Sequence, residues 1–437
     1  MVRISSKAGF IILCSLLLVI PLLAACSSDK TPEPDPMATP AGEPTQTPEP
    51  VITPTGEPTQ PPETVTITIG NHTDLTGVAA NAMSVITLAV KDTVDYYNEQ
   101  NLIPGVKVKV IDYDTQYDPS RDIPGYKLLK EKGADVLFGT VASAGLTLKP
   151  FLEEDKIVMI MMSANPKSFI PPGYVFALGN ASYEEQLFTL LKWISENDPD
   201  FPADRPAKIG GAMFGESAGI AIIEAAEKYA KANPEQYEWV EGFLTSFQFI
   251  WTAEAHALKD CDYVIPATPP SAFVKDYRKA GGKGKFIGTD AHTAFMGMVN
   301  SSDLWEEMDG MYSVRPFRWW TDDSEGGRLT RQILNENHAD QAEEIIRDGV
   351  GYITVQPIVM LLEAIKGTVE EVGAENFTSE DLYNYLLTFS MDFDGCQHSF
   401  SETKRTSNDY LNIHQLDAER KDFFLAHEGW VPIVTEP

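Results

Sequence analysis

The sequence predicts an α/β protein with two doubly wound lobes of parallel sheet, preceded by a signal peptide and a disordered linker. Three observations carry this prediction. Short strand-like runs alternate with helical patterns from residue 65 to about 161, and the same alternation starts again near residue 187. The run at residues 157–161 is continuously apolar, which is typical of a strand buried on both faces. Residues 65–437 provide enough chain for two domains of ordinary size.

Residues 1–25 have the pattern of a cleavable export signal. Arg3 and Lys7 give a basic start, an apolar run follows, and small residues lead into Cys26. This order resembles the signal of bacterial lipoproteins. The resemblance implies a mature chain that begins at Cys26, carries lipid on that thiol, and is held at the outer face of the cell membrane. The alternative is an uncleaved membrane anchor, for which the run is short and is interrupted by Pro21.

Residues 26–63 are expected to form a disordered tether. Residues 27–63 contain no aromatic residue, are dominated by Pro, Thr, Glu and Gln, and repeat the pattern of residues 39–46 at 53–60. Such a segment cannot bury enough apolar surface to offset the entropy lost on ordering. Frequent proline keeps it extended, so we expect it to hold the body away from the membrane.

Charge and cysteine content exclude some classes of partner. The chain has 64 acidic and 34 basic residues, which argues against a nucleic-acid ligand because phosphate binding needs a basic surface. No Cys/His spacing fits a metal site, so we predict neither a metal nor a cofactor. Apart from Cys14 in the signal and the lipid-bearing Cys26, the sequence contains only Cys261 and Cys396. These two residues could form a disulfide or could remain two buried thiols, and the sequence leaves both possibilities open.

The expected elements follow one another in a regular order. In the first lobe, strands are expected at residues 65–69, 106–110, 134–138 and 157–161, with helices around 86–97, 120–132 and from about 143. In the second lobe, strands are expected at 208–213, 263–265 and 285–287, with helices around 187–194, 222–229 and 272–279. Ligands of such sheets bind beyond the carboxyl ends of the strands, where small polar residues gather in this sequence.

Several segments resemble, in order, the leucine/isoleucine/valine-binding protein family. These proteins are extracytoplasmic substrate-binding components of ABC transporters with a type I periplasmic-binding fold. The matching segments cover most of residues 65–437 and are Thr73-Asp-Leu-Thr-Gly77, Val110-Ile-Asp-Tyr-Asp114, Gly133-Ala-Asp-Val-Leu-Phe-Gly139, Ser163-Ala-Asn165 and Phe286-Ile-Gly-Thr-Asp290.

The resemblance implies two lobes joined by a three-crossover hinge that closes on a ligand. We expect the crossings near Asn180, Arg315 and Ser390. The first lobe would then comprise residues 64–181 and 316–390, and the second lobe residues 182–315 and 391–437. The resemblance also implies a small amino-acid-like ligand and an ABC permease as the membrane partner. We expect the protein to act as a monomer.

The resemblance further implies ligand-binding residues. Ser143 lies at the expected start of a helix, where free backbone N–H groups favour the ligand carboxylate. Asp290 matches the position that pairs with the ligand ammonium. The remaining matched positions are Ser163, Ala164 and Asn165 for the amino-acid head group, and Ala218, which falls where the family often has an aromatic residue.

A rival pattern is Gly215-Glu-Ser-Ala-Gly219, which matches the nucleophile elbow of α/β-hydrolases. It would make Ser217 the nucleophile of a secreted esterase, with His398 or His427 as base. No His-Gly-Gly segment supplies an oxyanion loop upstream, and the surrounding segments fit the binding-protein pattern. We therefore predict a binding protein and no enzyme, with the esterase and a ligand-sensing receptor on the same fold as alternatives.

Overall fold

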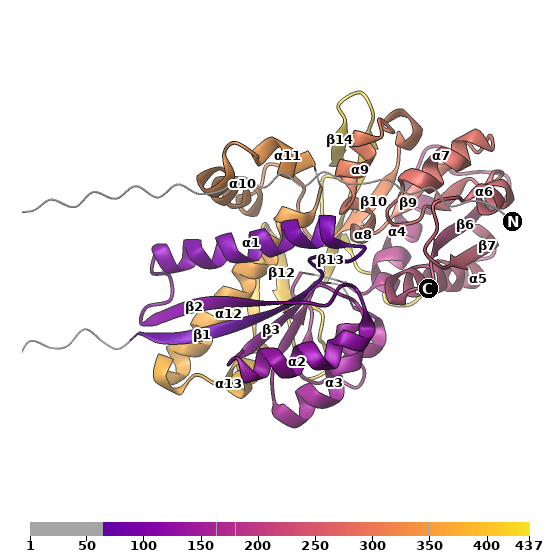
Figure 1. The fold of residues 1–437 in the computed structure, drawn as a ribbon. Helices are drawn as coiled ribbons and strands as arrows, with labels where there is room; N and C mark the ends of the chain where they lie inside the picture. Colours follow the sequence, from indigo (N-terminus) through magenta and orange to yellow (C-terminus); the bar gives the residue numbers. More distant parts are fainter. Residues whose placement is uncertain (1–63, 163, 180, 348) are drawn as a thin grey trace, which may run out of the picture. The chain divides into compact units, whose positions relative to one another are not determined.

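The computed structural model describes residues 64–437 except 163, 180 and 348. The predicted signal peptide, the tether and Cys26 therefore lie outside the described residues. The described residues belong to one compact unit, and it contains two main sheets. Figure 1 shows the strands of each sheet flanked by helices on both sides. This is the doubly wound α/β architecture that the alternating pattern predicts.

The first sheet has five parallel strands in the order β2-β1-β3-β4-β5. Helix α1 covers one of its faces, and α2 and α3 lie on the other (Figure 1). The apolar residues of β3 and β4 are fully buried because helices cover both sides. The elements are β1 (Val65–Thr73), α1 (Ala80–Glu99), β2 (Val106–Asp114), α2 (Asp122–Glu131), β3 (Val136–Gly139), α3 (Ala144–Asp155), β4 (Met159–Met161) and β5 (Val175–Phe176).

The second sheet has parallel strands β10-β9-β8-β6-β7, extended by antiparallel β13, β14 and β15 from the C-terminal part of the chain. Helices α4 and α5 pack together, as do α6 and α7. The elements are α4 (Tyr183–Asn197), β6 (Ala207–Phe214), α5 (Ser217–Ala232), β7 (Tyr237–Thr245), α6 (Thr252–Leu258), β8 (Tyr263–Ile265), α7 (Ser271–Lys279), β9 (Lys285–Gly288), α8 (Asp290–Thr293), α9 (Met296–Ser301), β10 (Tyr312–Arg315), β13 (Tyr410–Asp417), β14 (Asp422–Leu425) and β15 (Val431–Pro432).

Three segments of the chain run side by side between the two sheets. Ala177 and Thr406 form an isolated parallel bridge, and the amide of Gly179 donates to Ser407 Oγ at 2.7 Å. Asn408 Nδ2 donates to the carbonyl of Pro316 at 3.2 Å. These bonds tie the link after β5, the link after β10 and residues 405–408 into one hinge, as the fold class predicts.

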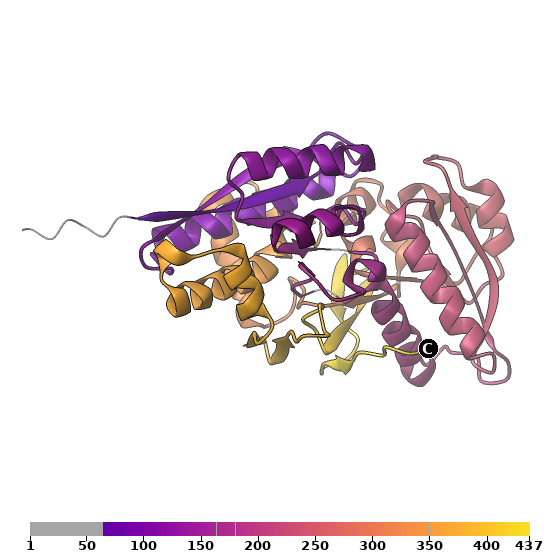
Figure 2. The same ribbon diagram turned by 90° about the horizontal axis from the view of Figure 1, so that it is seen from below.

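One of the three predicted hinge positions lies directly beside the observed links. Arg315 is the last residue of β10 and directly precedes the second link, whereas Asn180 lies outside the described residues. Ser390 begins a two-stranded hairpin, β11 (Ser390–Phe393) and β12 (Cys396–Ser399), and the hinge bonds occur after this hairpin. In Figure 2 the C-terminal part of the chain, in yellow, lies between the two halves of the compact unit.

The remaining helices come from the part of the chain that follows β10. They are α10 (Glu325–His338), α11 (Ala342–Arg347), α12 (Val355–Val372) and α13 (Ser379–Leu386). Among the described residues, Gly351–Val372 alone is long and apolar enough to cross a membrane by length and composition, and 89% of its apolar window is buried inside the protein. Since α12 packs against α1 and α13, we interpret it as a core helix.

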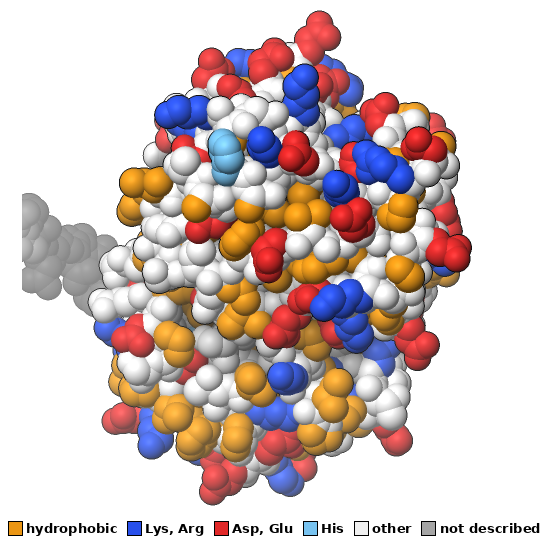
Figure 3. Space-filling view, turned by 90° about the vertical axis from the view of Figure 1, so that its right-hand side faces the viewer, with side chains coloured by type: hydrophobic (Ala, Val, Ile, Leu, Met, Phe, Trp, Pro, Cys, Tyr) orange, Lys and Arg blue, Asp and Glu red, His pale blue; other side chains and the backbone are white. Residues whose placement is uncertain are grey.

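Both cysteines in the described part of the chain are free and buried, so the structure favours two thiols over the disulfide. Burial raises the pKa of the Cys261 and Cys396 thiols to about 12. On the face seen in Figure 3, lysine and arginine side chains are interspersed with acidic ones. Strand β7 and the short strands β5 and β10 were not anticipated from the sequence, whereas the other parallel strands lie where the apolar runs predict them.

Candidate functional site

A cavity lies at the carboxyl ends of strands from both sheets. It is lined by Thr140 after β3, Glu216 after β6, Thr268 after β8 and Asp290 after β9. This is the edge at which parallel α/β sheets bind ligands. The space open to the centres of water molecules is about 120 Å³. One water needs roughly 10–15 Å³ by this measure, so the cavity has room for a small ligand of several heavy atoms.

One side of the cavity, here called the first wall, comes from the first lobe and carries no charged side chain among the described lining residues. Val78, Met83 and Ile86 come from the start of α1 and the loop before it, and Met162 follows β4. Asp74 holds this loop, because its carboxylate accepts hydrogen bonds from the amides of Gly77 and Ala79 at 2.5 and 2.9 Å. The first wall is therefore an apolar surface on a firmly held turn.

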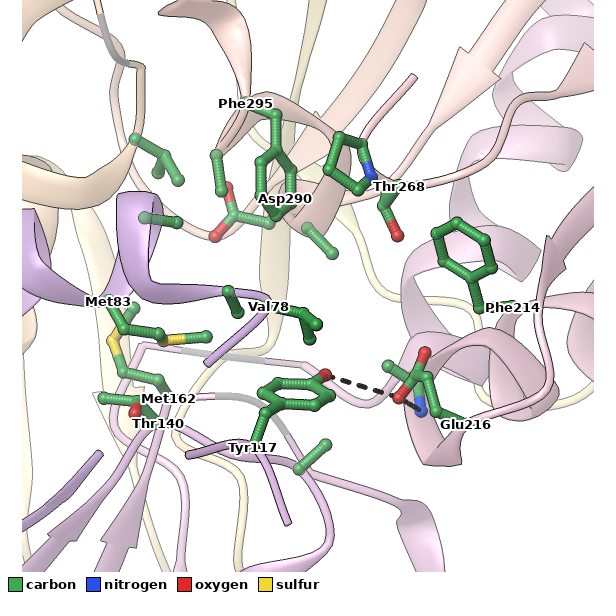
Figure 4. A pocket seen from close by; sticks show the side chains of 18 of the residues that line it. Val78, Met83, Tyr117, Thr140, Met162, Phe214, Glu216, Thr268, Asp290 and Phe295 are labelled. Atoms are coloured by element: carbon green, nitrogen blue, oxygen red, sulfur yellow. Dashed lines mark hydrogen bonds between the residues drawn. The ribbon is translucent and has the colours of Figure 1, made fainter. Parts of the chain in front are cut away.

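The opposite side, here called the second wall, combines aromatic rings with carboxylates (Figure 4). Phe214 ends β6, and Phe247 follows β7 with its ring centroid 4.5 Å from that of Phe214. Glu216 and Asp290 are the two charged residues among the described lining residues. No lysine, arginine or histidine lines the cavity within the same set.

Glu216 lies at the N-terminus of α5, where it is the N-cap residue. Its two carboxylate oxygens accept hydrogen bonds from the amides of Ala218 and Gly219 at 2.8 and 2.6 Å. The hydroxyl of Tyr117, which follows β2 in the first lobe, lies 3.5 Å from Glu216 Oε2, as Figure 4 shows. Burial raises the pKa of Glu216, and these donors act in the opposite direction.

Asp290 begins α8 and meets a buried cation of the same chain. Its carboxylate lies 2.8 Å from Arg315 Nη1, and Arg315 also donates to Thr293 Oγ1 at 2.6 Å. Arg315 is fully buried, and its guanidinium lies 4.3 Å from the centre of the Trp319 ring. Burial raises the pKa of Asp290, whereas the charge of Arg315 acts to lower it.

Comparison with known families agrees with this geometry. Residues 66–418 match the family described as periplasmic binding protein. The chain belongs to the periplasmic binding protein family. The resemblance predicted from the sequence is thereby confirmed, and with it the fold class of this binding protein. No curated protein sequence matches the chain.

Solved structures of similar fold cover most of this binding protein. A branched-chain amino acid ABC transporter protein from Thermus thermophilus, with bound valine, is 22% identical with a TM-score of 0.73, over 85% of this chain and 97% of the other. A fatty acid ABC transporter substrate-binding protein from Thermomonospora curvata is 16% identical with a TM-score of 0.71, over 84% and 95%. A solute-binding protein from Rhodopseudomonas palustris HaA2, in complex with p-hydroxybenzoic acid, is 14% identical with a TM-score of 0.68, over 85% and 98%.

The residues predicted to bind ligand divide into two groups. Ala218 and Asp290 line the cavity of this binding protein, whereas Ser143, Ala164 and Asn165 are not among its described lining residues. Ala164 is buried in the core, and the side chain of Asn165 accepts a hydrogen bond from the amide of Lys167. Ser163 lies outside the described residues. The roles carried over from the family therefore stay predictions.

Ser143 has a partner within the first lobe. Its hydroxyl donates to Asp122 Oδ2 at 3.1 Å, and Asp122 is fully buried with His72 3.7 Å away. Burial raises the pKa of Asp122 to about 6. The carboxyl group of Asp122 therefore lies directly behind the helix start that is predicted to bind the ligand carboxylate.

Sequence reasoning missed several lining residues. They come from loops and from helix faces, and they are Val78, Met83, Tyr117, Tyr183, Gln186, Phe247 and Phe295. Tyr117 could have been found, because it follows the predicted strand at residues 106–110. Phe247 could not, because β7 before it carried no recognised strand pattern.

Ser217, the nucleophile of the rival esterase reading, is the first residue of α5. The ring of His398 stacks on Phe317, and its Nδ1 lies 3.3 Å from Ser407 Oγ. His427 lies edge-on against Trp193. Within the described residues, neither histidine hydrogen-bonds Ser217, so the geometry does not assemble the pair that the elbow needs.

Proposed function

We propose that this chain is the lipid-anchored, extracytoplasmic substrate-binding component of an ABC importer. It captures an amino acid or a similar small solute in the cavity between its lobes and delivers it to a membrane permease. The observation that carries this proposal is the cavity itself, built at the strand ends of both sheets. Its apolar lining with a few polar groups is typical of small-molecule sites.

The similar structures support a ligand with a substantial apolar part. The Thermus thermophilus protein is described with valine, and the other two are described with p-hydroxybenzoic acid or as fatty acid transporters. The apolar first wall of this cavity suits the same kind of ligand body. Closure of the two lobes on the ligand would follow, because neither wall alone encloses it.

The proposal is tested by a thermal-shift screen of the full chain in detergent. Apolar and polar amino acids, their amides, small aromatic carboxylates and medium-chain fatty acids would be compared at equal concentration. A ligand that binds only the folded state raises the melting temperature. We expect at least one of these small solutes to raise the melting temperature; an unchanged melting temperature with every class would contradict the proposal.

The anchor is tested separately. Cys26→Ala removes the predicted lipid acceptor, so we expect the variant to leave the membrane fraction or to keep its signal uncleaved. Cys14→Ala is the matched control, because it changes a cysteine within the signal that is not at the expected cleavage site. Normal processing and unchanged membrane partitioning of Cys26→Ala would contradict the lipid anchor.

A further inference from the structure

The charges of the cavity indicate more about the ligand than its size does. This inference rests on the proposed function, because it concerns the same cavity. Among the described lining residues there are two carboxylates and no basic side chain. Both are partly buried, and a carboxylate removed from water is costly unless a cation meets it, so each of the two favours a partner.

Asp290 already has its partner inside the protein. Arg315 lies 2.8 Å from it, is fully buried, and is held in place by Thr293 and the ring of Trp319. A ligand ammonium at Asp290 would therefore meet an ion pair rather than a free charge. Asp290, which the family resemblance assigns to the ligand ammonium, therefore has less uncompensated negative charge than Glu216.

Glu216 has no basic side chain within salt-bridge distance among the described residues. Two backbone amides and the more distant Tyr117 hydroxyl occupy three of its acceptor positions, and an ionised carboxylate offers about four. The N-terminus of α5 compensates about half a charge at most. Glu216 therefore leaves net negative charge and acceptor capacity facing the cavity.

Aromatic rings surround the same part of the cavity. Phe214 lies beside Glu216, and Tyr117 approaches Glu216 from the first lobe (Figure 4). Phe247, which is 54% exposed and also lines the cavity, forms a tilted pair with Phe214. The faces of such rings attract cations, with most effect where water is excluded. Rings and a carboxylate together make a receptor for an organic ammonium group.

The helix start expected to hold a ligand carboxylate has the opposite character. The Ser143 hydroxyl is committed to Asp122, and that buried carboxyl group lies directly behind the helix start. A ligand carboxylate at this helix start could accept hydrogen bonds from the backbone amides of α3 but not from the Ser143 hydroxyl, and it would lie close to the carboxyl group of Asp122. A ligand carboxylate is therefore a weak contributor to binding.

From these contacts we infer that the ligand is an apolar organic cation whose ammonium group is received by Glu216 and the rings of Phe214, Phe247 and Tyr117, and that a ligand carboxylate is not required. The ligand class is that of amines, amino-acid amides or esters, and alkylammonium compounds with an apolar body. Free apolar amino acids belong to it through their ammonium group alone.

Calorimetric titration of the full chain with one matched series tests this inference. The series is leucine, leucine amide, the amine that lacks the carboxyl group, N-acetyl-leucine, which lacks the cation, and p-hydroxybenzoate. We expect the amide and the amine to bind at least as tightly as leucine, and the last two compounds to bind at least about tenfold more weakly, the scale of one charge-assisted hydrogen bond.

Variants locate the cation. Glu216→Gln should weaken the amine by about 10- to 100-fold, whereas Glu224→Gln, which changes an exposed residue of the same helix, should not. Phe247→Leu keeps an apolar side chain but removes a ring, so it should lower the affinity for the amine by roughly 2- to 10-fold. This variant provides the test if Glu216→Gln fails to fold.

The outcomes separate the two proposals. Tight binding of N-acetyl-leucine or p-hydroxybenzoate together with weak binding of the amine would overturn the cation inference and leave the binding-protein function intact. Equal affinity of wild type and Glu216→Gln for the amine would overturn it as well. No binding by any compound, in this series or in the wider screen, would overturn both.

Discussion

The two walls of the cavity differ in charge, although both are built from the same strand-to-helix turns. The first wall presents Val78, Met83 and Met162 and has no charged residue among its described members, whereas both carboxylates belong to the second wall. An apolar wall selects by size and shape, and a few placed polar groups select by chemistry. The difference teaches that discrimination between ligands of similar size depends on the second wall.

Each wall is associated with a carboxyl group that has a partner inside the protein, and the two are compensated differently. Asp122 behind the first wall is met by Ser143 and by His72 at 3.7 Å. Asp290 on the second wall is met by the permanent charge of Arg315 at 2.8 Å. Removing a partner should therefore be costly at the second wall and mild at the first.

The largest expected effect is at Arg315. Arg315→Met keeps the length of the side chain but leaves Asp290 buried without its cation, which should lower the free energy of unfolding by about 3–5 kcal/mol. Denaturant unfolding measures the change.

Two controls sharpen this prediction. Arg318→Met changes a partly exposed arginine three residues later and should cost less than about 1 kcal/mol. The double variant Arg315→Met, Asp290→Asn removes both charges and should recover part of the loss. If Arg315→Met is no less stable than Arg318→Met, the two carboxyl groups are not compensated differently and the comparison fails.

The second prediction concerns acid sensitivity. Burial lowers the pKa of His72, His292 and His398 to about 4, so the folded state holds all three neutral while the unfolded chain protonates them near 6.5. The contribution of these neutral histidines to the free energy of unfolding is complete above pH 6.5 and is lost as the pH falls toward 4. The loss is about 2 kcal/mol per histidine by pH 5.

Asp122 opposes this trend. Its folded pKa of about 6 lies above the ordinary value, so it favours the folded state as pH falls from about 6 toward 4. Burial also raises the pKa of Glu216 and Asp290, which act in the same direction as Asp122, and it lowers the pKa of His414, which acts with the other histidines. We expect the four histidines to outweigh the carboxyl groups, so the free energy of unfolding should fall from pH 7 to pH 5. Unfolding curves at both pH values measure it, and equal midpoints would show that these histidines are not held neutral. His292→Gln should reduce the slope more than His256→Gln, which changes an exposed histidine.

The sequence predicts the fold well because its signals are local. Apolar runs of residues 134–138 and 157–161 mark buried strands, and the turns after them mark the binding edge of the sheets. The cavity edge follows from these turns alone. β7 was missed because its burial pattern is mixed, with one fully buried residue at its start, so its sequence shows no continuous apolar run.

The site could be predicted only in part, because pairing of charges is a long-range property. Asp290 is visible as a polar residue after a strand, but its partner Arg315 comes from a different strand. Ser143 is visible at a helix start, but its commitment to Asp122 depends on the packing of α2 against α3. Glu216 lies in the strand-end loop at residues 214–218 that the sequence places at the binding edge, but the serine-centred motif drew attention to Ser217, so the carboxylate of Glu216 received no role.

The third prediction concerns the apolar wall. Met83→Ala removes apolar contact from the first wall, so affinity should fall by about 1 kcal/mol for every ligand that binds, whatever its charge. Titration with leucine and with the matched amine measures this, and the two losses should agree. A loss confined to one ligand would mean that the first wall also discriminates by chemistry.

The last prediction concerns Ser143. Ser143→Ala removes the hydroxyl that donates to Asp122 at 3.1 Å, so it should lower the free energy of unfolding by about 1 kcal/mol, the value of one ordinary hydrogen bond. Affinity for leucine should change little, because the backbone amides at the start of α3 remain and the lost hydroxyl faces Asp122. Thr147→Ala is the matched control, since Thr147 also contacts Asp122 and sits one turn further along the helix. Unfolding and titration of both variants distinguish the two roles of Ser143. A large loss of leucine affinity in Ser143→Ala, absent in Thr147→Ala, would place a ligand carboxylate at this helix start and give the first wall a chemical selectivity of its own.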